Sequence, residues 1–264
     1  MLTSFFRRIA SLFVWLLIFF GAQNAFGQFV TIWQTDLPGG VSANDQLFMN
    51  HTVGFNYTVN WVDVNNAGSF GTVNVNTPKF ITFPAPGTYK LTITGTYPRP
   101  LVGFGGDAPK LLSVEQWGTN HWTSMQQAFQ GCTNMVINAT DVPDLSGVTS
   151  MNAMFYGASS VNSDLSSWDV STVTDMSFAF SFATSFNGNI STWNMSSVTD
   201  MNAMFQHAES FNQDISSWNV SSVTNFYQVF SGALVFNGNI GGWNVSNGTM
   251  MGQMFTNAVQ FNQD

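Results

Sequence analysis

Side chains that could carry out chemistry are few in this chain and stand far apart. The three histidines are His51, His121 and His207, and the single cysteine is Cys132. No His/Cys cluster has the spacing of a zinc site, and no glycine-rich phosphate loop precedes a helical pattern. Cys132 has no disulfide partner within the chain and stands where a later segment has Ala158, which indicates a packed thiol rather than a nucleophile.

Two groups of acidic residues could suggest a catalytic or metal site. Asp141 and Asp144 flank Pro143 like a pair of glycosidase carboxylates, but no general base or cleft accompanies them. A regularly spaced column of acids and amides could suggest calcium, but it lacks the dense acidic clustering that hard cations need. The column consists of Asp164, Asn189, Asp214, Asn239 and Asp264. The sequence therefore predicts no catalytic residue, no metal and no cofactor, and the chain is not expected to be an enzyme.

The residues that dominate the sequence recur every twenty-five positions, and they are structural in type. A fixed period of this length is the signature of a solenoid, and of a leucine-rich repeat in particular. The tryptophans are Trp168, Trp193, Trp218 and Trp243. The phenylalanines are Phe155, Phe180, Phe205, Phe230 and Phe255. The asparagines are Asn162, Asn187, Asn212 and Asn237. The aromatic columns are expected in the core, and the asparagine column is expected to bond the backbone of neighbouring turns.

Each repeat contains a pattern typical of a strand. Ile215, Trp218 and Val220 have the spacing of a leucine-rich-repeat strand. Alternation places Trp218 and Val220 in the core and Asn219 outside.

A second pattern in each repeat is typical of a short helix. Asp200 is an N-cap type of residue, and Met201, Met204, Phe205 and Ala208 behind it form one apolar stripe. The predicted fold is an α/β leucine-rich-repeat solenoid of 25-residue repeats, each with a strand and a short helix, preceded by a small antiparallel β-sandwich.

Three segments are expected along the chain. Residues 1–27 have the basic start, short apolar run and small residues of a secretory signal peptide. Residues 28–99 lack the period and show alternating strands broken by turn signals, which indicate the β-sandwich. Residues 100–264 begin with a Gly/Pro-rich junction and then hold the repeats. The last residue falls where a new strand is expected and no capping repeat follows, so the array is expected to be incomplete.

The repeats closely resemble those of BspA-like leucine-rich-repeat surface proteins. The strings FNGNISTWNMSSVTDMNAMF and FNQDISSWNVSSVTNFYQVF carry this resemblance, which covers about Leu111 to Asp264. Upstream, the segment from Phe83 to Leu91 looks like the last strands of a PKD-like immunoglobulin-type sandwich. The resemblance implies a secreted or cell-surface bacterial protein that acts as an adhesin, and it brings no catalytic residues.

The surface expected to bind a partner is the concave sheet of the repeats, with its flat ladder of short neutral side chains. This ladder consists of Asp169, Asn194, Asn219, Asn244, Ser171, Ser196, Ser221 and Ser246. An extracellular protein or a glycan is the expected partner, bound through many weak contacts. Two alternatives stay open: a structural spacer that displays other domains, and a carbohydrate-binding accessory module.

The charge of the chain restricts its partners further. The formal net charge is −8, and only 8% of residues are charged. Removal of Arg7 and Arg8 with the signal peptide makes the charge about −10. Nucleic acid and anionic membrane surfaces are therefore not expected partners, and the mature chain is not expected to insert into a membrane.

Overall fold

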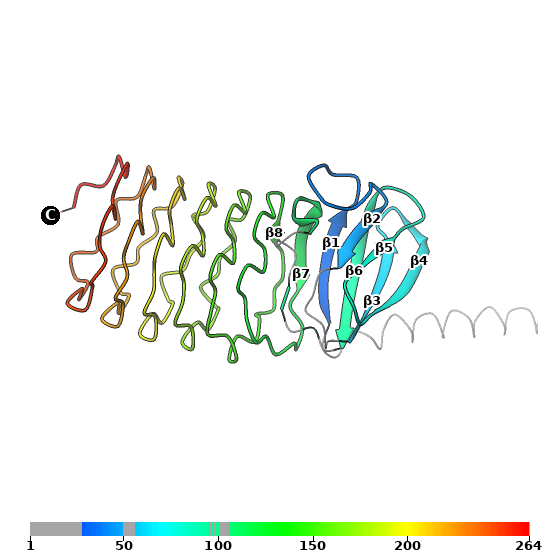
Figure 1. The fold of residues 1–264 in the computed structure, drawn as a ribbon, viewed down its shortest axis with the longest axis horizontal. Helices are drawn as coiled ribbons and strands as arrows, with labels where there is room; N and C mark the ends of the chain where they lie inside the picture. Colours follow the sequence, from blue (N-terminus) through cyan, green and yellow to red (C-terminus); the bar gives the residue numbers. More distant parts are fainter. Residues whose placement is uncertain (1–27, 50–55, 96, 98, 101–105, 264) are drawn as a thin grey trace, which may run out of the picture.

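The computed structural model describes residues 28–49, 56–95, 97, 99–100 and 106–263. The predicted signal peptide, residues 1–27, lies outside these residues. A β-sheet region stands at one end of the molecule, and a stack of coils extends from it to the C-terminal end (Figure 1). Within the described residues, no helix is long and apolar enough to cross a membrane.

A six-stranded sheet and a two-stranded sheet form the β-sheet region. The strand order of the large sheet is β4-β3-β6-β1-β7-β8, and the small sheet pairs β2 with β5. The elements are β1 Phe29–Gln34, β2 Gln46–Met49, β3 Tyr57–Asp63, β4 Asn66–Val75, β5 Lys79–Thr82, β6 Thr88–Gly95, the short 3-10 helix η1 Ala108–Lys110, β7 Leu111–Gln116 and β8 Val136–Ile137. Alternation explains the strands: in β6, Tyr89, Leu91 and Ile93 are buried while Lys90 is exposed.

The expected antiparallel sandwich over residues 28–99 is not a closed unit. β7 pairs antiparallel with β1, and β8 pairs parallel with β7, so the large sheet is mixed and crosses the expected boundary at residue 100. The aromatic rings of the two segments also meet, since Phe29 lies 5.7 Å from Trp117 and 5.3 Å from Trp122. The sheet and the first coil therefore share one core.

The prediction of an α/β leucine-rich-repeat solenoid is wrong, because the described repeats contain no α-helix. Over the expected helix, Met204 N–H donates to the Met201 carbonyl at 3.1 Å and Ala208 N–H donates to Phe205 at 3.0 Å, which are turn bonds rather than helical ones. The backbone is left-handed at Ala203 (φ +51°) and His207 (φ +54°). Right-handed helical geometry cannot continue through such residues.

Alternate amides of the same segment bond the next coil instead. Met201 N–H donates to the Asn225 carbonyl at 3.0 Å, Ala203 to Tyr227 at 2.8 Å and Phe205 to Val229 at 2.9 Å. Successive coils are thus joined here by parallel backbone hydrogen bonds, and the amides between them close turns within one coil.

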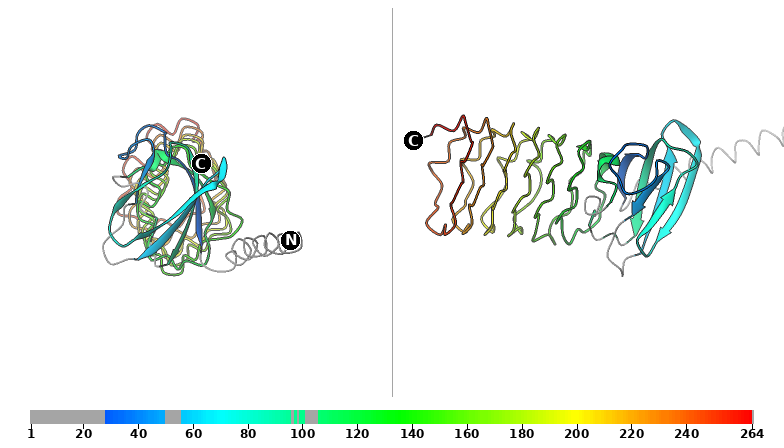
Figure 2. Two further views of the ribbon diagram at one scale, coloured as in Figure 1. Left: turned by 90° about the vertical axis from the view of Figure 1, so that its right-hand side faces the viewer. Right: turned by 45° about the horizontal axis from the view of Figure 1, so that its top comes forward.

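The expected strand around Trp218 is also absent. Trp218 N–H donates to the Ile215 carbonyl at 3.2 Å, which closes a turn. In the described part of the later coils, the strand pairing consists of single parallel bridges that link Ser150, Asp175, Asp200, Asn225 and Met250 in turn. The residues that the structure describes are thus almost entirely in β and turn structure. Figure 2 shows the coils following one another in a single stack.

Candidate binding surface

The predicted binding ladder forms a row of exposed turns, not the face of a sheet. The side-chain oxygens of Asn194, Asn219 and Asn244 accept the N–H groups of serines two residues ahead, at 3.1, 3.1 and 3.2 Å. Those serines are Ser196, Ser221 and Ser246, and the same bond joins Asp169 to Ser171 at 3.0 Å. These Asx turns fix the carboxamides and leave the side-chain N–H₂ groups without a partner among the described residues.

We name this feature the amide row: Asn194, Asn219 and Asn244, one exposed carboxamide in each of three successive coils. Asp169 occupies the same place one coil earlier, and hydrogen bonds from the Ser171 hydroxyl and amide lower the pKa of its carboxyl. The row therefore offers N–H donors at three coils and an anionic acceptor at the fourth.

The tryptophan column lies beneath this surface. Trp168, Trp193, Trp218 and Trp243 are all buried. The Trp218 ring stacks on Trp193 and Trp243 at 6.5 and 6.3 Å, and its indole N–H donates to the Ile190 carbonyl at 3.1 Å. Trp168 instead meets Trp117 edge-on at 5.3 Å, at the start of the stack.

The phenylalanine column continues the same packing. Its rings stack from coil to coil at 5.5 to 5.8 Å, through Phe155, Phe180, Phe205, Phe230 and Phe255. The first four are buried, and Phe255, in the last described coil, is partly exposed.

The asparagine column binds the coils together through the backbone. The side-chain oxygen of Asn187 accepts the N–H of Asn212 at 2.9 Å, and that of Asn212 accepts the N–H of Asn237 at 2.8 Å. Asn162 and Asn237 make the equivalent bonds to Asn187 and Asn262. Each of these side chains supplies an acceptor to a backbone group of the next coil.

The two acids around Pro143 do not form a pair. Asp141 accepts the backbone N–H groups of Trp117 and Gly118, at 3.0 and 2.8 Å. Asp144 lies 2.9 Å from His121 Nδ1, and hydrogen bonds from Ser146 and His121 lower the pKa of its carboxyl to about 2. Each carboxylate thus has separate partners.

The acidic residues of the column considered for calcium close local turns with their side-chain oxygens. Asp164 and Asp214 accept the N–H groups of Ser166 and Ser216, at 2.9 and 3.0 Å. Among the described residues, no group of three or more acids, histidines or cysteines could hold a metal ion. Cys132 is fully buried, and burial raises the pKa of its thiol well above the usual range.

A buried ion pair that the sequence reasoning missed ties a loop to the junction. Lys110 Nζ lies 3.9 Å from Asp107 Oδ1, and it donates to the carbonyls of Ser42, Ala43 and Gln46. Asp107 in turn accepts from the Ser42 amide and hydroxyl, at 3.0 and 2.7 Å. These donors and acceptors satisfy one another, so the pair fixes the loop against the junction.

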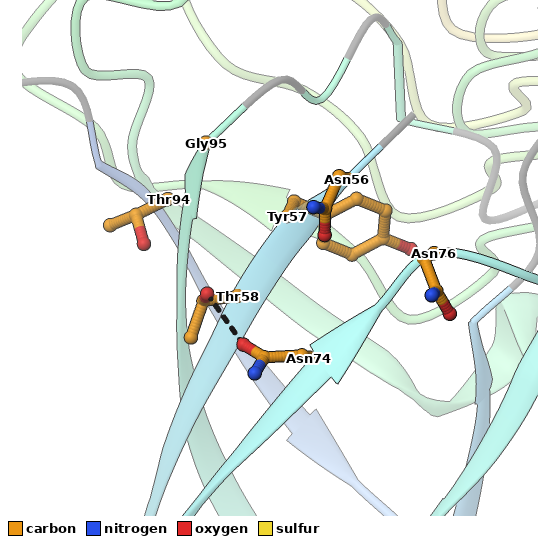
Figure 3. Close-up of a pocket in the computed structure, with 7 residues that line it drawn as sticks. All are labelled: Asn56, Tyr57, Thr58, Asn74, Asn76, Thr94 and Gly95. Carbon is orange, nitrogen blue, oxygen red and sulfur yellow. Dashed lines mark hydrogen bonds between the residues drawn. The ribbon is translucent and has the colours of Figure 1, made fainter. Parts of the chain in front are cut away.

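A polar depression of about 430 Å³ lies at one end of β3, β4 and β6 (Figure 3). Its lining groups are neutral, and Thr58 Oγ1 donates to Asn74 Oδ1 across it at 2.9 Å. The lining residues are Asn56, Tyr57, Thr58, Asn74, Asn76, Thr94 and Gly95. Among the described residues, the lining contains no carboxylate, imidazole, thiol or amine.

The architecture defines a class of protein: a repeat protein whose stacked coils present exposed rows of neutral polar groups. The chain matches the family described as "Mycoplasma protein of unknown function, DUF285" over residues 107–198 and 179–264. These matches cover the whole coil stack, and the chain belongs to this family. No curated protein and no solved structure matches the chain.

Proposed function

We propose that this chain is a non-catalytic adhesion or protein-interaction module that acts at the bacterial cell surface or after secretion. The observation that carries the proposal is the amide row. Asn194, Asn219 and Asn244 repeat one fixed, exposed donor in successive coils. Such a row suits a partner held by many weak bonds rather than by one tight pocket.

Two further observations support an extracellular location. The first 27 residues have the pattern of a secretory signal, and the repeats resemble those of BspA-like surface proteins. The low content of charged residues, 8%, leaves a neutral polar surface, and the net charge of −8 argues against nucleic-acid partners.

The test is a binding screen of the purified protein against a panel of extracellular matrix proteins. The informative variant replaces Asn194, Asn219 and Asn244 together by aspartate. Aspartate keeps the oxygen that closes each turn, as Asp169 does, but removes the N–H₂ donor. We expect binding by the wild-type protein and at least a tenfold weaker affinity for the variant.

A control makes the same kind of substitution on another row, with two added charges instead of three. Asn189→Asp with Asn239→Asp copies Asp164 and Asp214, which stand at equivalent places in neighbouring coils, and should leave binding intact. A folded wild-type protein that binds no member of the panel contradicts the proposal and favours a structural spacer.

A further inference from the structure

Two positions in each coil have a left-handed backbone, and glycine occupies one of them in three coils. Gly131, Gly157 and Gly232 occupy it with φ of +75°, +68° and +72°. Phe182, His207 and Asn257 occupy the same position in other coils, with φ of +58°, +54° and +58°. A bulky side chain with such a φ is strained, because its β-carbon crowds the neighbouring carbonyl.

Burial does not explain why the chain keeps the side chains of Phe182 and His207. Phe182 is 39% exposed and His207 is half-buried. The next coil is shaped around the imidazole: a β-carbon added at Gly232 would come within 2.5 Å of His207 Nδ1. The other left-handed position holds a non-glycine residue in all six coils, so the backbone alone does not single out Phe182 and His207. What does is the presence of two partly exposed rings at a position that glycine fills in other coils.

The rings belong to a small cluster on the surface. The Phe182 ring lies 4.7 Å from His207, nearly parallel to it, and 5.5 Å from Tyr156. Tyr156 and Phe182 are tilted by 56°, so these two rings do not cover each other's faces fully.

A chain of side-chain amides runs beside the rings. Gln206, next to His207, donates to Gln228 at 3.1 Å and accepts from the Ser181 hydroxyl at 3.3 Å. Gln228 and the exposed Tyr227 both donate to Gln253, at 2.5 and 3.1 Å. We call the set the aromatic–amide patch: Tyr156, Phe182, Gln206, His207, Tyr227 and Gln228. It contains no carboxylate and no ammonium group.

We propose that the aromatic–amide patch binds a neutral polysaccharide that lies across successive coils. Aromatic rings pack against the C–H surfaces of sugars, and amides exchange hydrogen bonds with sugar hydroxyls. A repeating polymer matches a surface that repeats from coil to coil, and the absence of charge on the patch matches a neutral ligand. This inference rests on the chain being a binding module, but it uses a different surface from the amide row.

Two variants test it with residues that the chain itself uses at the equivalent places. Phe182→Gly copies Gly157 and Gly232, and Tyr156→Ser copies Ser181 and Ser231. The probes are a neutral β-glucan and a neutral mannan, with dextran sulfate as a charged control, each cast in a native gel. We expect a neutral polysaccharide to retard the wild-type protein, and each variant to need at least tenfold more polysaccharide for the same retardation.

Thermal stability provides the second readout. Phe182→Gly relieves the strain, so its unfolding midpoint should rise by about 2–4 °C even as binding is lost. Gln127→Gly is the matched control: Gln127 also has a left-handed backbone (φ +56°) but lies outside the patch. It should become more stable and bind as the wild-type protein does.

Three results would overturn the inference. A lower unfolding midpoint for Phe182→Gly would make the ring a stabilising element. A wild-type protein retarded by neither neutral polysaccharide would remove the proposed ligand, whatever the amide row does with matrix proteins. Loss of matrix-protein binding in Phe182→Gly, without retardation by either polysaccharide, would assign the patch to a protein partner.

Discussion

At the scale of single residues, the repeated tryptophan has the largest expected energetic role. Trp218 is 3% exposed, stacks on two other indoles and donates to a backbone carbonyl of the preceding coil. Trp218→Ala should lower the free energy of unfolding by about 3–5 kcal/mol, because it leaves a cavity and removes one of the two hydrogen bonds that the Ile190 carbonyl accepts. Denaturant titration measures this change.

The control for this prediction is Tyr227, an exposed aromatic residue that follows Trp218 in the chain. Tyr227 is 37% exposed, so Tyr227→Ala should lower the free energy of unfolding by less than about 1 kcal/mol. An equally small effect of Trp218→Ala would show that the tryptophans do not form the core of the stack.

The carboxyl of Asp144 should make stability depend on pH in the acid range. Hydrogen bonds from Ser146 and His121 lower its folded-state pKa to about 2, below the usual value of about 3.9. The stabilisation is therefore present above about pH 4 and is lost as the pH falls towards 2. The carboxylate is well exposed, so the effect should be small and screened by salt.

Unfolding measured between pH 5 and 2 tests this prediction, with Asp144→Asn as the variant. The variant should lose less stability than the wild-type protein as the pH falls. Identical pH profiles for the two proteins would show that Asp144 is not the source of the pH dependence.

At the scale of one coil, the asparagine column joins each turn to the next. The Asn212 side chain supplies the acceptor for the Asn237 backbone N–H at 2.8 Å. Asn212→Ala should therefore lower the free energy of unfolding by about 1 kcal/mol. Asn212→Asp keeps an acceptor oxygen and should retain most of that stability in a denaturant titration at neutral pH. Equal losses for both variants would rule out the coil-to-coil bond as the cause.

The sequence predicts which residues of a coil are buried better than it predicts the backbone that buries them. Met201, Met204, Phe205 and Ala208 are all buried, yet they do not form the predicted helix. Their spacing fits overlapping turns as well as a helix, and the bonds between coils that decide the outcome join residues 24 positions apart. The glycines at the left-handed position, such as Gly157, were the signal that a helix could not continue.

The sequence predicts the candidate binding surface only in part: it predicts that the asparagines are exposed, but not how their side chains are oriented. The exposed, neutral character of Asn194, Asn219 and Asn244 follows from their place in the repeat. Their fixed orientation depends on Asx turns, which a strand prediction does not contain. The strain at Phe182 and His207 has no counterpart in single-residue patterns, because it follows from the backbone of the whole coil.

At the scale of the whole molecule, the sheet and the coil stack depend on each other. β1 lies between β6 and β7, and Phe29 packs on rings that follow residue 100. The Gly/Pro-rich segment 98–109 predicted a boundary there, since pairing between distant strands leaves no local pattern.

A fragment of residues 28–99 should therefore fail to fold as it does in the intact chain. It lacks β7, the partner of β1, and it lacks Trp117 and Trp122, which cover Phe29. We expect a poorly dispersed amide NMR spectrum and no cooperative unfolding transition. A well-dispersed spectrum with a sharp transition would show that the sheet region is an independent domain.

Far-ultraviolet circular dichroism of the purified protein tests the central claim most directly. The claim is that the repeats are turns stacked through bonds between coils, and the amide row and the aromatic–amide patch both depend on that stacking. We predict a spectrum of β and turn structure without the double minimum of α-helices. A clear helical double minimum would contradict this account and restore a helix to every repeat, with different side chains on the surface.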